Sequence, residues 1–209
     1  MEKIFITATG TGIGKTFIAT MLCRKYLAEG KKVVALKPII SGYNTNDNNN
    51  DTALILQSLG LEITQKNIEK TSPWRFEAPL SPHIASRMEG KEISLDAVVD
   101  FCQKHEKLDI DVLIIEGVGG VLVPLNDKYT VRDLMARLNY KNILVSANYL
   151  GSISHTLTAF EALQSKNITL YQLMISESGE NIMPIEEFSK ILANFLPVNL
   201  PIVDLSRAL

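Results

Sequence analysis

The stretch from Gly10 to Thr16 places the tightest constraint on what this chain can fold into. It has the sequence Gly-Thr-Gly-Ile-Gly-Lys-Thr, follows an apolar run at residues 4–6 and precedes a helical pattern that begins at Phe17. A strand, a glycine-rich turn and a helix start in this order form a phosphate cradle, because backbone N–H groups point inward and the helix N-terminus is partly positive. In this pattern Lys15 reaches the β and γ phosphates, and the Thr16 hydroxyl can bind Mg²⁺.

The loop departs from the P-loop consensus at one position. The consensus G-x-x-x-x-G-K-[ST] has its first glycine where this chain has Thr9, while the closing Gly-Lys-Thr is intact. A dinucleotide-binding loop is the main alternative, since Gly10 and Gly12 match the start of its G-x-G-x-x-G fingerprint. That fingerprint needs a third glycine where this chain has Lys15, so the sequence favours a nucleoside triphosphate.

Predicted strands and helices alternate along the chain. Asp51 is expected to cap the helix at 52–59, and residues 61–80, with two prolines, are expected to be irregular. Such alternation predicts an α/β fold with a doubly wound, mostly parallel sheet of about seven strands, helices on both faces and one domain spanning 1–209. The expected strands cover residues 4–9, 32–36, 112–115, 142–147, 169–175 and 201–204, and the expected helices cover 16–29, 52–59, 94–106, 129–138, 152–165 and 184–196, with a further helix opening at Ser81-Pro82.

Composition excludes several classes of partner. The formal net charge is −2, which gives no general attraction to nucleic acid or to anionic lipid. Cys23 and Cys102 are the only cysteines and are expected to be buried thiols in a reducing compartment. The sequence shows no secretory signal pattern and no apolar stretch long enough to span a bilayer, so we expect a cytoplasmic protein.

Charged residues follow two of the predicted strands where those strands end. Lys37 follows the strand at 32–36, and Glu116 follows the strand at 112–115. Because ligands gather at the carboxyl ends of parallel strands, both should open onto the edge that holds the phosphate cradle. A second lysine there can hold an anionic substrate or a transferring phosphoryl group, and the glutamate can bind Mg²⁺. Asp51 or Asp47 could supply a third oxygen ligand, and spacing does not choose between them.

Six stretches of the chain resemble dethiobiotin synthase, a family of biotin biosynthesis, and they run in the family's order over most of the sequence. They are 7–16, Lys37-Pro38-Ile39-Ile40-Ser41-Gly42, Ala78-Pro79-Leu80-Ser81-Pro82-His83, Glu116-Gly117-Val118-Gly119-Gly120, Val123-Pro124-Leu125 and Leu150-Gly151-Ser152-Ile153-Ser154-His155. The resemblance implies an ATP-dependent cyclo-ligase with a P-loop NTPase-like fold. Its substrates would be 7,8-diaminopelargonic acid, CO₂ or bicarbonate, and ATP or another nucleoside triphosphate, and its cofactor would be Mg²⁺.

The resemblance also implies a reaction path. The diamine captures CO₂ as a carbamate, the carbamate attacks the γ-phosphate to form a carbamic–phosphoric anhydride, and the second amine displaces phosphate and closes the ureido ring. Carbamate and triphosphate are both anionic, so two lysines, Mg²⁺ and a backbone cradle would offset their repulsion. Positioning and charge stabilisation are what phosphoryl transfer mainly needs, so a nucleophile motif is not required.

The resemblance and the loop pattern together name the candidate site residues. The catalytic candidates are Lys37, Lys15 and Thr11, and the metal ligands would be Thr16, Asp51 and Glu116. The nucleotide site would comprise Gly12, Ile13, Gly14, Lys15, Thr16, Phe17, Asp51, Glu116, Gly117, Val118, Gly119 and Ser176. The substrate would contact Thr11, Lys37, Ser41, Gly151, Ser152, Ile153 and Ser154, and the last four would come from the second subunit of a homodimer, where a helix start receives the substrate carboxylate.

Two other functions share parts of this pattern. A partition- or septum-positioning regulatory ATPase has the same fold but carries an extra lysine early in its P-loop, where this chain has Thr9-Gly10-Thr11-Gly12. This chain also lacks a basic amphipathic tail of the kind that binds membranes. Amidating ligases of the same superfamily are usually larger and fused to a glutamine-hydrolysing domain, for which 209 residues leave no room.

We predict weak discrimination among nucleotide bases. The family usually recognises the base with an asparagine after the strand at 169–175, where this chain has Ser176-Glu177-Ser178, and relatives often continue past Leu209 with residues that cover the base. Comparing kcat/KM for ATP, GTP and CTP tests this expectation. A preference for ATP above about a hundredfold, close to 3 kcal/mol, would contradict it.

Overall fold

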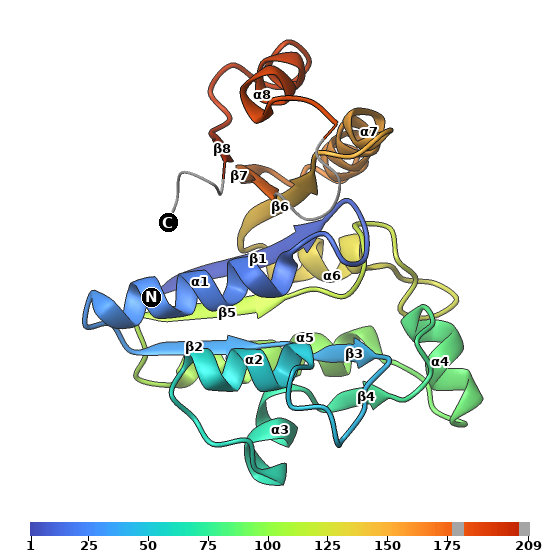
Figure 1. The fold of residues 1–209 in the computed structure, drawn as a ribbon. Coiled ribbons are helices and arrows are strands. Elements are labelled where there is room, and N and C mark those ends of the chain that lie inside the picture. Colours follow the sequence, from blue (N-terminus) through green and yellow to red (C-terminus); the bar gives the residue numbers. More distant parts are fainter. Residues whose placement is uncertain (177–181, 205–209) are drawn as a thin grey trace.

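The computed structural model describes residues 1–176 and 182–204 and consists of a central sheet with helices on both of its faces (Figure 1). Six strands form this sheet in the order β2-β5-β1-β6-β7-β8, and every neighbouring pair is parallel. The strands are β1 (Glu2–Ala8), β2 (Val33–Leu36), β5 (Val112–Glu116), β6 (Lys141–Ala147), β7 (Leu170–Ser176) and β8 (Ile202–Asp204). The predicted doubly wound α/β fold is confirmed, with six strands in the main sheet.

Helices connect these strands. They are α1 (Lys15–Ala28), α2 (Asp51–Ser58), α3 (Gln65–Thr71), α4 (Pro82–Met88), α5 (Leu95–Lys104) with the short 3₁₀ turn η1 (His105–Lys107), α6 (Val131–Leu138), α7 (Ser152–Gln164) and α8 (Ile185–Ala193). Each predicted strand and helix boundary falls within three residues of these bounds. Within the described residues, no helix is both long and apolar enough to cross a membrane.

The side chains of each strand alternate between two hydrophobic cores. In β1, Ile4 and Ile6 pack against α1 and α2, while Phe5 points to the opposite face, where α5, α6, α7 and α8 pack. In β5, Ile114 joins the first core and Ile115 joins the second. A parallel sheet that is covered on both faces needs apolar residues at consecutive positions, which explains the continuous apolar runs in these strands. Both cysteines are buried, as predicted.

The strand order places the phosphate loop at a point where the chain changes direction. β1 lies between β5 and β6, and the chain builds one side of the sheet through β2 and β5 before crossing to β6, β7 and β8. Open parallel sheets bind their ligands at such a switch point, outside the carboxyl ends of the strands. The loop between β1 and α1 lies at this position (Figure 1).

The expectation that residues 61–80 are irregular was wrong. Thr64 caps α3 by accepting a hydrogen bond from the Asn67 N–H, and β4 (Trp74–Phe76) pairs with β3 (Ile39–Ser41) in a separate two-stranded parallel sheet. A helix of seven residues and a strand of three are too short to leave a clear periodic pattern. They form because tertiary contacts hold them.

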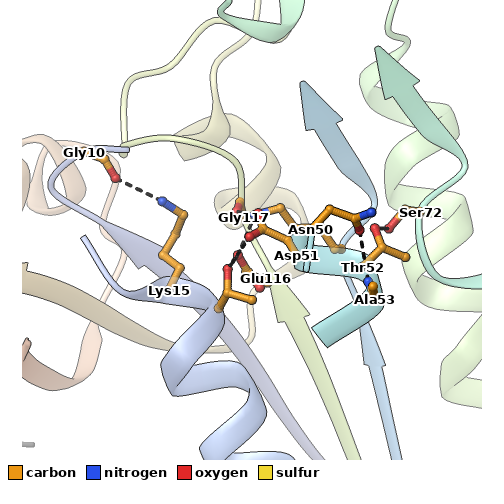
Figure 2. Close-up of polar contacts among 11 residues, drawn as sticks. Gly10, Lys15, Asn50, Asp51, Thr52, Ala53, Ser72, Glu116 and Gly117 are labelled. Carbon is orange, nitrogen blue, oxygen red and sulfur yellow. Dashed lines mark hydrogen bonds and ion pairs between the residues drawn. The ribbon is translucent and has the colours of Figure 1, made fainter. Parts of the chain in front are cut away.

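The predicted cap of α2 also needs correction, because Asn50 rather than Asp51 occupies the N-cap. The Asn50 side chain accepts a hydrogen bond from the Ala53 N–H at 3.0 Å, and Asp51 is the first residue of the helix (Figure 2). The sequence allowed either residue, since asparagine and aspartate cap helices equally well. The consequence is that the Asp51 carboxylate is free of capping and points elsewhere.

Replacing Asn50 with alanine should lower the free energy of unfolding by about 1 kcal/mol, because the N-cap acceptor is lost. Asn50→Asp keeps the cap acceptor but loses the amide donor to the carbonyl oxygens of Asn44 and Asp47, so it should be less destabilising than Asn50→Ala without being neutral. Asn48→Ala, at an exposed position in the same loop, is the matched control and should change the free energy by less than about 0.5 kcal/mol. Urea unfolding measures all three, and equal values for the two alanine variants would contradict the assignment of the cap.

Candidate active site

The loop between β1 and α1 has the geometry of an anion site. α1 begins at Lys15, directly after Gly14, whose φ of 99° lies in the left-handed region that favours glycine. A Cβ added at Gly14 would lie 2.7 Å from Oγ of Ser176 at the end of β7, so close packing also requires glycine there. The backbone N–H groups at this helix start are therefore unobstructed and available to a phosphate.

A cleft of about 760 Å³ opens beside this loop, at the carboxyl edge of the sheet. The P-loop, the segments that follow β2 and β5, and the first turn of α2 form its walls. Its lining residues are Thr11, Gly12, Ile13, Gly14, Lys15, Thr16, Lys37, Ile40, Ser41, Asp51, Pro79, Leu80, Ser81, Pro82, Glu116, Val118, Gly119 and Val123. The cleft thus gathers residues from five separate parts of the chain, because the segment 79–82 also lines it.

A larger cavity of about 960 Å³ lies at the opposite, amino-terminal edge of the sheet, where β6, β7 and β8 begin. Lys141 is its only charged lining residue, and none of the predicted site residues reaches it. Volume alone does not identify a site, and of these two cavities the smaller cleft holds four charged residues, Lys15, Lys37, Asp51 and Glu116. We therefore take the smaller cleft as the candidate active site.

Lys15 lies almost fully buried in the cleft, with 6% of its surface exposed. Its Nζ donates a hydrogen bond to the Gly10 carbonyl oxygen at 2.9 Å, so the side chain folds back over its own loop (Figure 2). Burial lowers the pKa of the Lys15 ammonium to about 8, and the positive charge of Lys37 adds to that effect. A phosphate bound here would supply the opposite charge that this lysine lacks.

Lys37 lies at the centre of a second, tighter cluster. Its Nζ is 2.5 Å from Oε1 of Glu116, 2.9 Å from Oδ2 of Asp51 and 3.0 Å from the carbonyl oxygen of Gly117. The Thr16 hydroxyl lies 2.8 Å from Oδ1 of Asp51 and 2.8 Å from Oε1 of Glu116. Figure 2 shows the Asp51 and Glu116 side chains converging from α2 and β5.

The charged groups of this cluster shift one another's pKa values. Burial by itself would lower the pKa of Lys37, but Glu116 and Asp51 more than offset it, so the pKa is raised and the ammonium keeps its proton. Burial and the nearby charge of Asp51 raise the pKa of the Glu116 carboxyl, and Lys37 opposes that shift. Burial would raise the pKa of Asp51, but Lys37 and Thr16 hold it below its usual value.

The oxygens around Thr16 have the chemistry of a site for a hard cation. Oε2 of Glu116 is buried and has no hydrogen-bond partner, although a buried carboxylate oxygen normally has one. Within residues 1–176 and 182–204, no group of three or more His, Cys, Asp or Glu side chains is arranged to hold a metal ion. A cation here would therefore need the Thr16 hydroxyl, water or phosphate oxygens as further ligands, as Mg²⁺ usually does.

The structure brings most of the predicted residues together. Asp51 reaches Thr16 and Lys37, whereas Asp47 is exposed and accepts a hydrogen bond from the Asn49 N–H. The predicted residues that line the cleft are Thr11, Gly12, Ile13, Gly14, Lys15, Thr16, Lys37, Ser41, Asp51, Glu116, Val118 and Gly119. Their roles in binding and catalysis stay predictions.

Other predicted residues lie outside the lining of the cleft. Phe17 is 46% exposed on α1, Gly117 contributes its carbonyl oxygen to Lys37, and the Ser176 side chain lies against Gly14. The last four predicted substrate contacts form the start of α7, and they do not border the cleft of their own chain: Gly151, Ser152, Ile153 and Ser154. Glu177 and Ser178 stand in the region where the family usually has its base-recognising asparagine, and they lie outside the described residues.

The sequence prediction missed one wall of the cleft. Ile40, Val123 and the segment 79–82 line it, and α4 begins at Pro82 within that segment. The signal was present, because residues 78–83 are one of the stretches that resemble dethiobiotin synthases. The segment 79–82 has no charged side chain and only one hydroxyl, that of Ser81, so residue chemistry alone did not single it out.

Comparisons with known proteins identify the family of this chain. The sequence model of a family described as "AAA domain" matches residues 2–200. The ATP-dependent dethiobiotin synthetase BioD of Acidiphilium cryptum is 37% identical over 203 residues, covering 96% of this chain and 91% of the relative. The protein of the same name from Phenylobacterium zucineum is 36% identical and covers 88% of this chain and 80% of the relative.

Among solved structures, FtsY from Mycoplasma mycoides has a TM-score of 0.55 at 14% identity. The match covers 97% of this chain and 58% of that one, and at this identity it shows a shared fold alone. The family assignment rests on the relatives that match by sequence. A third such relative, the ATP-dependent dethiobiotin synthetase BioD of Methylobacterium nodulans, is 35% identical and covers 92% of this chain and 88% of the relative. By its sequence and by the cleft at the end of its strands, this chain belongs to the family of ATP-dependent dethiobiotin synthetases.

Proposed function

We propose that this protein is an ATP-dependent cyclo-ligase that converts 7,8-diaminopelargonic acid and CO₂ to dethiobiotin. One observation carries the proposal beyond family membership: two buried lysines, Lys15 and Lys37, line one cleft with two carboxylates. A P-loop needs only its own lysine to bind a triphosphate. The second lysine suits a second anion that must approach the γ-phosphate, and a carbamate is such an anion.

The proposed reaction is the path that the resemblance to dethiobiotin synthases implies. One amine of the substrate adds to CO₂ and loses a proton, which gives a carbamate. A carbamate oxygen bonds to the γ-phosphorus as the bond to ADP breaks, and the second amine bonds to the carbamate carbon as phosphate leaves. This amine loses one proton to the departing phosphate or to solvent. Lys15 and Lys37 would stabilise the negative charge on the reacting oxygens, and Thr11 and Ser41 would hold the end of the substrate where reaction occurs.

We also propose that Thr16, Asp51 and Glu116 hold Mg²⁺ beside the nucleotide. The unpartnered Oε2 of Glu116 and the 2.8 Å contacts of Thr16 to both acids support this set. When bound, such an ion neutralises charge on the phosphate oxygens. Asp51 is preferred over Asp47 because only Asp51 reaches Thr16.

A homodimer would complete the site. Residues 150–154 do not border the cleft of their own chain, and Leu150 is 85% exposed. The start of α7 offers backbone N–H groups suited to a carboxylate, so we propose that it receives the substrate carboxylate across a subunit boundary. A regulatory ATPase of the partition or septum type is disfavoured, because the relatives identified are named as synthetases.

The purified protein should form dethiobiotin when it is incubated with 7,8-diaminopelargonic acid, bicarbonate, Mg²⁺ and ATP. Mass spectrometry detects the product, and a reaction without bicarbonate is the control, because the ureido carbon comes from CO₂. ATP hydrolysis stimulated by DNA or lipid, with no dethiobiotin, would instead support the regulatory ATPase.

Replacing Lys37 with glutamine should reduce kcat by at least about a hundredfold while changing the Kd for ATP by less than about tenfold, because its charge acts on the reacting groups. Lys66→Gln, at an exposed position on α3, is the matched control and should leave both constants unchanged. Steady-state kinetics and equilibrium binding separate the two effects. Loss of ATP binding with turnover preserved at saturation would make Lys37 a nucleotide-binding residue instead.

A further inference from the structure

In this structure the Lys37 ammonium has one acceptor from its own chain for each of its N–H groups. An ammonium carries three N–H groups, and Lys37 has three acceptors within 3.0 Å: Glu116, Asp51 and the Gly117 carbonyl oxygen. The side chain is 2% exposed, so solvent hardly competes for it. This arrangement is stable, but it holds the lysine away from any bound anion.

The same two acids are the proposed ligands of the divalent cation. Lys37 and the Thr16 hydroxyl both contact Oε1 of Glu116. Lys37 also contacts Oδ2 of Asp51, while Thr16 contacts Oδ1 of the same carboxylate. A cation placed among Thr16, Asp51 and Glu116 would meet a positive charge a few ångströms away. Two like charges at that separation repel strongly where the surroundings exclude water. The ammonium and the cation thus compete for one pair of carboxylates.

We propose that Lys37 takes the place of the divalent cation in the nucleotide-free protein. The cation then binds only together with the nucleotide, and Lys37 leaves the carboxylates and turns toward the phosphate and the substrate. This inference rests on the proposed cation site at Thr16, Asp51 and Glu116. Before the nucleotide binds, Lys37 pairs with the two carboxylates; afterwards, it contacts the reacting groups.

The net charge of the cluster and the length of the lysine side chain both allow Lys37 to leave the carboxylates for the phosphate. Lys37, Asp51 and Glu116 together carry a formal charge of −1, which gives a free cation less attraction than the two acids would alone. Mg-bound triphosphate supplies phosphate oxygens that can replace the carboxylates as partners of the ammonium. Lys37 and Ser41 line the same cleft, and a lysine has a flexible four-carbon stem, so a change of side-chain rotamer suffices.

Titration with Mn²⁺ in the absence of nucleotide tests the proposal, with the free Mn²⁺ signal followed by electron paramagnetic resonance. The wild type should bind Mn²⁺ weakly alone and at least about tenfold more tightly with a non-hydrolysable ATP analogue. Lys37→Gln and Lys37→Met should bind Mn²⁺ without nucleotide at least about tenfold more tightly than the wild type, a difference of about 1.4 kcal/mol.

Lys15→Met is the matched control, because it removes an equally buried positive charge that contacts neither acid. It should raise Mn²⁺ affinity clearly less than the Lys37 variants do. An equal rise would show a general effect of charge and would overturn the proposal. The double variant Lys37→Gln/Glu116→Gln should lose the gain, and a gain that survived would place the Mn²⁺ elsewhere and overturn it too.

Circular dichroism establishes that each variant is folded before it is titrated. If both Lys37 variants fail to fold, titration of the wild-type protein still tests the proposal. Tight Mn²⁺ binding without nucleotide overturns it, and Mn²⁺ binding that depends on nucleotide supports it. The dethiobiotin assay is a separate measurement. Absence of product with nucleotide-dependent Mn²⁺ binding would refute the proposed function alone, whereas product with tight nucleotide-free binding would refute this inference alone.

Discussion

The ion pair between Lys37 and Glu116 joins the two strands on which the candidate site depends. β2 and β5 are parallel neighbours, and Leu36 lies opposite Ile115, so the next residues of each strand emerge side by side. Both side chains are buried, and each charge is tolerated only because the other is present. Removing one partner of a buried ion pair typically costs about 3–5 kcal/mol, because the remaining charge is left uncompensated. Stability of the sheet edge and chemistry of the cleft thus depend on the same groups.

The central part of the site could be predicted from the sequence because strand ends obey a simple rule. The phosphate loop, Lys37 and Glu116 each follow an apolar run, and parallel strands bring such positions to one edge. The order of the strands could not be predicted in this way. Placing β5 between β2 and β1 depends on packing among α1, α2 and the sheet, and no local pattern encodes it.

The sequence could not predict some of the shortest helices and strands, and it could not choose between neighbouring residues that suit the same structural position. α3 and β4 are too short for their periodicity to be distinctive, and β4 exists as the partner of β3. Asn50 and Asp51 are both good N-cap residues, so only the observed hydrogen bond to Ala53 decides between them. The segment 79–82 carries no charged side chain, and the resemblance to a family was the signal that drew attention to it.

The cap of α2 affects which sequence changes are tolerated in the asparagine-rich loop at residues 44–50, which precedes this helix. Asn50 fixes the first turn of the helix, and the next residue, Asp51, directs its carboxylate at Thr16 and Lys37. Residues 44–49 are exposed, and two of their side chains accept hydrogen bonds from N–H groups within the loop. The carbonyl oxygens of Asn44 and Asp47 also accept hydrogen bonds from the Asn50 side chain. Side-chain substitutions should therefore be tolerated between 44 and 49, whereas an insertion there, or loss of the cap at 50, would displace the carboxylate of Asp51.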